Sequence, residues 1–171
     1  FDIDHMNLGE EENKNMKKSI YAAPTEVSEG FEVEAVSATT VQSAAVAVQN
    51  EILNDIATIG AKLGDSKLAA AATDSSKKVT ATVRSVVDVD PTTATKNDAG
   101  NYVVTLTSSY IGSGDVLVLH YNGTGWDVIV PTSVVNGAVT FETPSLSPVA
   151  LVEVNVSANA VATSPKTGET I

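Results

Sequence analysis

Two apolar runs joined by a short glycine-rich connector dominate the hydrophobic pattern of the chain. The runs are Val116–Tyr121 and Trp126–Val130, and the connector between them is Asn122–Gly125. Glycine and asparagine tolerate the positive φ angles of a tight reversal, so the pattern predicts a β-hairpin. The first run is apolar on both faces, whereas Asp127 points away from the apolar face of the second. We therefore expect a central first strand, a half-buried second strand and a core position for Trp126.

A different period, of three and four residues, precedes the strands and predicts an amphipathic helix that starts near Ser37. Thr39 or Thr40 is expected to cap its start, and Gly60 to end it. The apolar stripe consists of Val41, Ala45, Val48, Ile52, Ile56, Ile59 and Leu63.

A second, short helix is predicted over Lys67–Ala72, after a cap at Asp65 or Ser66. We expect both helices to cover a sheet. The first stripe could instead be a partner-binding or coiled-coil face, but an alanine-containing stripe of this length is more often core.

Period-two alternation begins after the helices and predicts a long strand that ends at Pro91, with one buried and one wet face, as in antiparallel sheets. Its buried face would carry Val79, Ala81, Val83, Val87 and Val89. Further strands are predicted at Tyr102–Thr107, on both sides of the Asn136–Gly137 turn, and at Pro148–Val154, which is nearly all apolar and so central. Phe31 and Val33 could belong to a short edge strand or to a linker. About six strands at short spacing favour a two-sheet β-sandwich.

Length and composition allow one core of ordinary size, because the chain has 171 residues of which 43% are hydrophobic. We predict a flexible acidic leader over residues 1–36 and a single domain over 37–154. The domain would consist of helices at 38–72 and a β-sandwich at 78–154. A linker with a terminal motif would occupy 155–171.

The net charge of −11 argues against nucleic acid or an anionic membrane surface as a partner, since both would repel the chain. The sequence contains no cysteine, which excludes disulfides, thiolate chemistry and cysteine metal sites. No apolar run approaches the roughly 20 residues that span a bilayer. We predict no cofactor and no membrane span in this chain.

The order of several segments resembles a recurrent module of cell-surface proteins from gut Firmicutes. The matching segments are Leu53–Ile56, Ser85–Val89, Val116–Tyr121 with Trp126, and Leu146–Ala150. The resemblance covers about Ser37 to Val154 and rests mostly on core and turn residues. It implies an antiparallel Ig-like β-sandwich, preceded by an N-terminal helical segment, close to a wall-anchoring signal.

The C-terminal tail carries Ser164-Pro165-Lys166-Thr167-Gly168, which is similar to the sortase sorting motif in its Ser-Pro-x-Thr-Gly form. The resemblance implies that a sortase cysteine attacks the carbonyl of Thr167 and that Gly168 leaves as the amine. Pro165 would keep the motif extended, and the small-residue linker 155–163 would leave it accessible. The apolar stretch and basic tail that follow such motifs are not in this sequence, so anchoring is an inference. A chance Pro-Lys-Thr-Gly turn is the alternative.

Few residues suggest catalysis or metal binding. His5 lies in the leader, and His120 lies in a predicted central strand, where a packed or hydrogen-bonded role is expected. A loop is bracketed by oxygen donors that could converge on calcium, although solvated acids at strand ends are common. These donors are Asp88, Asp90, Asn97 and Asp98. Lys78 falls on the polar phase of its strand, whereas a self-formed Lys–Asn crosslink needs a buried lysine.

The sequence as a whole predicts a non-enzymatic, extracellular module at the bacterial surface. It would be a wall-proximal spacer or adhesion module, with a sortase and cell-wall peptidoglycan as partners of the tail. The alternative is a module that binds carbohydrate or a host glycoprotein through loops at one end of the sandwich, with Tyr102, Tyr110 and Tyr121 as candidate aromatic contacts. A pilus subunit would require a lysine nucleophile in an exposed strand or linker, and the sequence offers no clear candidate.

Overall fold

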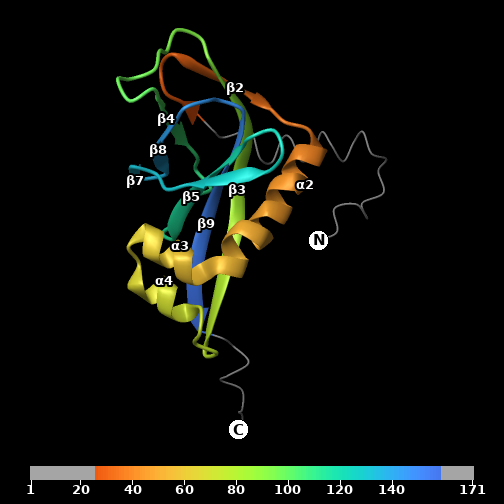
Figure 1. Cartoon of the computed structure of the whole chain (residues 1–171), viewed down its shortest axis with the longest axis vertical. Coiled ribbons are helices and arrows are strands. Elements are labelled where there is room, and N and C mark those ends of the chain that lie inside the picture. The colour runs from red at the N-terminus through yellow and green to blue at the C-terminus, as the bar shows by residue number, and fades with distance from the viewer. Residues whose placement is uncertain (1–25, 159–171) are drawn as a thin grey trace.

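The computed structural model describes residues 26–158, which form two antiparallel sheets and a helical segment (Figure 1). The larger sheet has the order β2-β3-β9-β5-β6 and the smaller sheet β1-β4-β8-β7. The strands are β1 (Glu26–Val27), β2 (Phe31–Ala35), β3 (Lys77–Pro91), β4 (Tyr102–Thr107), β5 (Asp115–Tyr121), β6 (Trp126–Ile129), β7 (Ser133–Val135), β8 (Ala138–Thr143) and β9 (Pro148–Ala158). This confirms the predicted class, a mainly β protein with two antiparallel sheets and a helical segment near its N-terminus.

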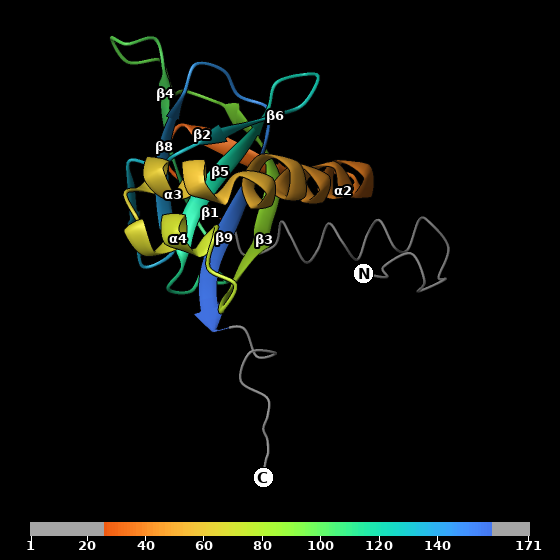
Figure 2. The same cartoon turned by 60° about the horizontal axis from the view of Figure 1, so that its bottom comes forward.

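The larger sheet is the middle layer of the molecule. The helices lie against one of its faces (Figures 1 and 2), and the smaller sheet packs against the other. Leu117 and Ala150 face the helices, whereas their neighbours Val118 and Leu151 face the smaller sheet. The central strands are therefore buried on both faces, which explains why β5 and β9 are almost entirely apolar.

The β5–β6 hairpin forms as the sequence predicts, with Tyr121 opposite Trp126 and Val118 opposite Ile129. β5 lies inside the sheet and β6 at its edge. The Trp126 side chain is buried, as predicted, and it packs with the helix-side core.

β3 differs from its prediction because its two halves bury opposite faces. Val79 and Val83 pack on the helix side, but Val87 and Val89 pack against the smaller sheet. The pairing register with β9 shifts between Val83 and Ser85, a β-bulge that moves every later side chain to the other face. The prediction of one continuously wet face is therefore wrong for the second half of the strand.

The predicted helix consists of several pieces. They are α2 (Ala38–Ala47), a π-helical turn η2 (Val48–Ile52), a 3₁₀ turn η3 (Leu53–Asp55) and α3 (Ile56–Leu63), followed by α4 (Ser66–Ala71). The extra residue per turn in η2 changes the direction of the chain, so that α2 and α3 follow different parts of the sheet (Figure 1). Ala45, which is predicted to lie in the core, is exposed, and its neighbour Ala44 is buried instead.

The helix boundaries correct two predictions and confirm a third. Ser37, and not Thr39 or Thr40, caps α2 by accepting a hydrogen bond from a backbone N–H in the first turn. Gly60 lies inside α3, and Gly64 ends that helix with a φ of 69°. Asp65 caps α4, in agreement with the sequence.

The Asn136–Gly137 turn has the conformation that the sequence predicts. Asn136 and Gly137 have φ angles of 51° and 82°, as a type I′ turn requires, and they join β7 to β8. β2 is an edge strand and pairs with the end of β3, which decides between the edge strand and the linker that the sequence allows. Residues 26–35 therefore belong to the folded unit, and the prediction of a flexible leader that extends to residue 36 is wrong. Within residues 26–158, no helix is both long and apolar enough to cross a membrane.

Candidate functional site

The predicted sorting motif, Ser164, Pro165, Lys166, Thr167 and Gly168, lies outside the described residues. The structure describes the strand that leads to it. β9 continues past Val154 to Ala158, so part of the predicted linker is strand. Only residues 159–163 separate the last described residue from the motif.

β9 is held on both sides over most of its length. It pairs with β3 from Ala158, opposite Lys77, to Pro148, opposite Asp88. On its other side it pairs with β5 between His120 and Asp115. The strand nearest the tail is thus the middle strand of the larger sheet (Figure 2).

A buried carboxylate fixes the middle of β9. Glu153 is 2% exposed and accepts hydrogen bonds from Arg84 Nε at 2.9 Å and from the backbone N–H groups of Gly112 and Gly114 at 2.9 and 2.6 Å. Burial alone would raise the pKa of Glu153, but these two amides and the guanidinium outweigh it and hold the pKa below its ordinary value. Through these contacts Glu153 connects three parts of the fold, which are the bulge of β3, the strand β9 and the loop before β5.

The sequence prediction missed this network. The predicted alternation puts Arg84, which lies between the positions predicted to be buried, on the wet face of its strand, and Glu153 lies within the predicted apolar strand Pro148–Val154. The visible signal was a single acidic residue inside a continuous apolar run, because a buried charge must be paired.

His120 has the packed, hydrogen-bonded role that the sequence predicts. It is 5% exposed, and its Nε2 lies 2.9 Å from Ser147 Oγ. Burial lowers its pKa, against the opposing effects of Asp127 and a backbone hydrogen bond to Ser145. The Ser147 hydroxyl also donates to the carbonyl oxygen of Tyr121, so the pair ties β5 to the loop before β9.

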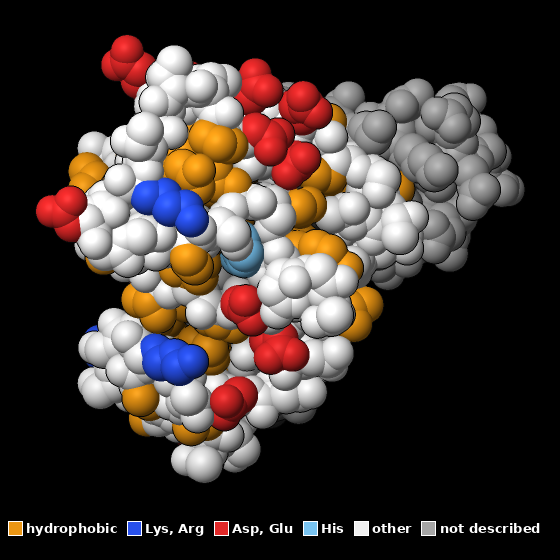
Figure 3. Space-filling view, turned by 45° about the horizontal axis from the view of Figure 1, so that its top comes forward, with side chains coloured by type: hydrophobic (Ala, Val, Ile, Leu, Met, Phe, Trp, Pro, Cys, Tyr) orange, Lys and Arg blue, Asp and Glu red, His pale blue; other side chains and the backbone are white. Residues whose placement is uncertain are grey.

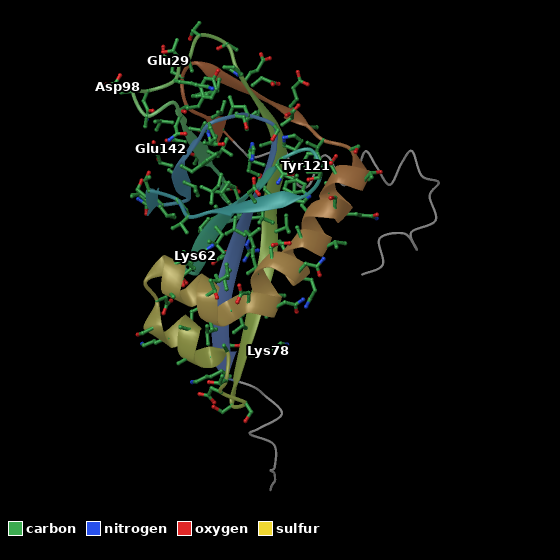
Figure 4. The ribbon with its side chains drawn as sticks, viewed as in Figure 1. Glu29, Lys62, Lys78, Asp98, Tyr121 and Glu142 are labelled. Atoms are coloured by element: carbon green, nitrogen blue, oxygen red, sulfur yellow. The ribbon has the colours of Figure 1, made fainter. Side chains whose placement is uncertain are left out.

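The residues proposed for calcium do not form one group. Asp90 clusters instead with Glu32 and Glu34 of the paired strand β2, their carboxylate oxygens lying within 4.8 Å of one another. The side-chain oxygen of Asn97 accepts from backbone N–H groups of its own loop. Figure 4 shows Asp98 at the tip of that loop.

The neighbouring carboxylates repel one another. The pKa of Asp88 is raised, first by burial and then by the charges of Asp90 and Glu34. Figure 3 shows that acidic side chains gather on a surface that carries few lysines and arginines. An exposed acidic group of this kind is common in proteins without a metal.

A small pocket lies where the first turns of α2 meet the β5–β6 hairpin. It has a volume of about 200 Å³ and is lined by Thr39, Thr40, Ser43, Tyr121, Trp126 and Pro148. The indole N–H of Trp126 donates to Ser43 Oγ at 2.8 Å, and the rings of Trp126 and Tyr121 are 5.3 Å apart. Tyr121 lies beside α2 in Figure 4.

Of the three tyrosines predicted as aromatic contacts, only Tyr121 belongs to this pocket. Tyr102 packs edge-on against Phe31 and lies under the Lys96 ammonium, and Tyr110 is half exposed on a loop. Sequence reasoning missed Ser43, because its contact with Trp126 joins positions far apart in the chain.

A larger groove of about 550 Å³ runs along the start of β5, the C-terminal end of α3 and the β6–β7 connection. Asp115 lies in its wall, and its carboxyl group is hydrogen-bonded to that of Asp65, the α4 cap. Burial, then this hydrogen bond and the charge of Asp65, raise the pKa of Asp115 to about 6. The same hydrogen bond lowers the pKa of Asp65.

The chain was compared with protein-family models, with curated proteins and with solved structures, and none of them matches.

Proposed function

We propose that the chain is a non-enzymatic extracellular module that a sortase attaches to the bacterial cell wall through its C-terminal tail. The observation that carries the proposal is the sequence Ser164-Pro165-Lys166-Thr167-Gly168, placed shortly after the last strand of the folded unit. The module would act as a wall-proximal spacer or adhesion unit, with a sortase and peptidoglycan as partners.

The chemistry would take place at the Thr167–Gly168 peptide bond. The thiolate of the sortase attacks the Thr167 carbonyl carbon, the amide bond breaks, and Gly168 leaves as an amine after it takes up a proton. A wall-peptide amine then attacks the thioester, forms a new amide bond with Thr167 and releases the enzyme thiol. Pro165 restricts φ and favours the extended conformation in which such peptides enter grooves.

The position of β9 supports the spacer role. A chain anchored at Thr167 is pulled through residue 158, and β9 lies between β3 and β5, with its hydrogen bonds across the direction of pull. The end of β9 lies at the bottom of Figure 1 and β2 near the top, so a pull on the tail acts along the long axis of the molecule.

The absence of cysteine suits an exported protein that must fold by packing alone, and the charge of −11 suits a soluble surface domain. The test is to incubate the chain with a class B sortase and an amine nucleophile and to measure the intact mass. We expect loss of residues 168–171 and addition of the nucleophile, and no reaction for Thr167→Ala. An unchanged mass, with a control peptide processed normally, would refute the proposal.

A further inference from the structure

We propose that the pocket between α2 and the β5–β6 hairpin binds a single pyranose ring of a glycan. Its walls are the rings of Tyr121, Trp126 and Pro148 on one side and three hydroxyl groups of α2 on the other. The inference does not depend on the sorting motif, because none of the lining residues belongs to the tail.

The lining offers both kinds of contact that a sugar needs. The apolar C–H face of a pyranose can pack on the aromatic rings, and its hydroxyl groups can pair with side-chain oxygens. Ser43 Oγ accepts the Trp126 N–H and keeps its own proton for donation. Thr39 is exposed in the first turn of α2, and among the described residues its hydroxyl has no hydrogen-bond partner.

The pocket is already formed before a ligand enters. The Trp126–Ser43 hydrogen bond fixes the indole against α2, and the hydroxyl of Tyr121 donates to Gly123 O at 3.0 Å, which fixes the second ring. Few rotamers therefore remain to be ordered on binding, and this reduces the entropic cost.

Electrostatics favours an uncharged ligand. None of the side chains that line the pocket carries a charge. A strongly charged ligand would lose its hydration there without gaining an ion pair, whereas the hydroxyl groups of a neutral sugar can pair with the hydroxyl groups of the lining.

The size of the pocket limits the ligand to one ring. Its volume of about 200 Å³ is below the roughly 300–1,000 Å³ of sites for drug-sized ligands. We therefore expect recognition of a terminal or side-branch sugar with an affinity in the millimolar range.

The single tryptophan of the chain makes the test direct, because all tryptophan fluorescence comes from Trp126. The probes are methyl β-glucoside, methyl β-galactoside, methyl α-mannoside and N-acetylglucosamine, each titrated into the full chain. We expect a saturable change with at least one of them. Thr39→Val should weaken that binding about five- to tenfold, and Tyr121→Leu should abolish it. Thr80→Val, at an exposed position on β3, should leave the affinity unchanged.

A backbone NMR titration of the same sugar must shift amide signals of α2 and the β5–β6 hairpin. The proposal is overturned if no probe gives a saturable change, or if the shifted signals lie elsewhere. It is also overturned if Nα-acetyl-lysine methylamide binds at the pocket and the sugars do not, since the site would then be one for a basic side chain.

Discussion

Arg84 Nε and Glu153 Oε1 are 2.9 Å apart, and this ion pair sits on the β-bulge that reverses the faces of β3. The Arg84 side chain is 31% exposed and that of Glu153 is 2% exposed. The carboxylate therefore depends on its partners much more than the guanidinium does, because only Arg84 can recover hydrogen bonds from water.

Glu153→Ala should lower the free energy of unfolding by about 3–5 kcal/mol, because it removes three hydrogen bonds to a charged acceptor at once and leaves the amides of Gly112 and Gly114 without this partner. Arg84→Met should cost less, about 1–2 kcal/mol, because the amides of Gly112 and Gly114 still hold the carboxylate. Urea unfolding followed by circular dichroism measures both values, with Glu51→Ala as a control at an exposed helical position. Equal losses for the two variants would contradict this asymmetry.

Gly60→Ala should destabilise the protein even though alanine favours helix. A Cβ at this position would lie 2.4 Å from Ala69 N and 2.8 Å from Ala69 Cβ, so α4 would have to move away from α3. We expect a net loss of about 1–3 kcal/mol, the usual range for overpacking. Thermal unfolding provides the measurement.

Gly64→Ala is the matched control, because its Cβ would meet nothing within 4 Å and only the positive φ of 69° is strained. It should cost about 1–2 kcal/mol, the penalty of the left-handed conformation. Only Gly60→Ala should also change the NMR signals of α4. If α4 keeps its signals in Gly60→Ala, the close helix contact is not as described.

The Asp65–Asp115 pair should make stability depend on pH. The pKa of Asp115 is about 6 in the folded protein against an ordinary 3.8, so its proton stabilises the fold at low pH and this contribution is lost as pH rises through about 6. The lowered pKa of Asp65 acts in the opposite sense and only at more acidic pH. Asp115→Asn keeps a side chain that can donate to Asp65 and removes the titration.

We therefore expect Asp115→Asn to be more stable than the parent chain at pH 7.5 and about equally stable at pH 5. His120 also titrates, and its effect on the pH dependence of stability has the opposite sign. Its lowered pKa gives stability that is present above its ordinary 6.5 and lost as pH falls. Measuring the difference between parent and variant cancels the His120 contribution. If the stability difference between variant and parent is the same at both pH values, the Asp115 proton does not stabilise the fold as described.

Pulling on the two ends of the chain should release the N-terminal strands before β9. β1 pairs only through Glu26 and Val27, and β2 pairs on one side with the end of β3, whereas β9 is paired on both sides. Optical-tweezer traces should therefore show an early, low-force step. The absence of native cysteine allows a disulfide to be placed between Glu32→Cys and Asp90→Cys, which face each other across β2 and β3.

Oxidation of this double variant should raise the force of the first step, and a reducing agent should restore it. If the force of the first step does not change when the disulfide forms, the pairing of β2 with β3 is not what breaks in that step.

The predictable parts of the fold are those that depend on local chemistry. Asn136–Gly137 and the Asn122–Gly125 connector can be read as turns because few residues adopt their φ angles. The bulge after Val83 and the π-helical turn at Val48–Ile52 are not predicted. At the bulge only Ser85 and Val86 depart from the alternation, and in the helix the apolar stripe runs unbroken through the turn. They are imposed by packing between layers that no local window contains.

The candidate sites divide in the same way. The sorting motif is contiguous and can be recognised from the sequence alone. The pocket requires a contact between Ser43 and Trp126, which are 83 positions apart in the chain, and the Glu153 network requires the loop before β5 to fold over the middle of β9. The raised pKa of Asp115 follows from burial and then from a contact between a helix cap and a strand start, which are far apart in the sequence.

The most direct test of wall attachment is to locate the new bond that a class B sortase forms on the full chain, with ¹⁵N-labelled triglycine as the nucleophile. Tandem mass spectrometry of the C-terminal peptide should place the labelled amine on the Thr167 carbonyl, with Gly168–Ile171 released as a free peptide. An intact C-terminus, or a label at any other residue while a control peptide reacts normally, would contradict the account.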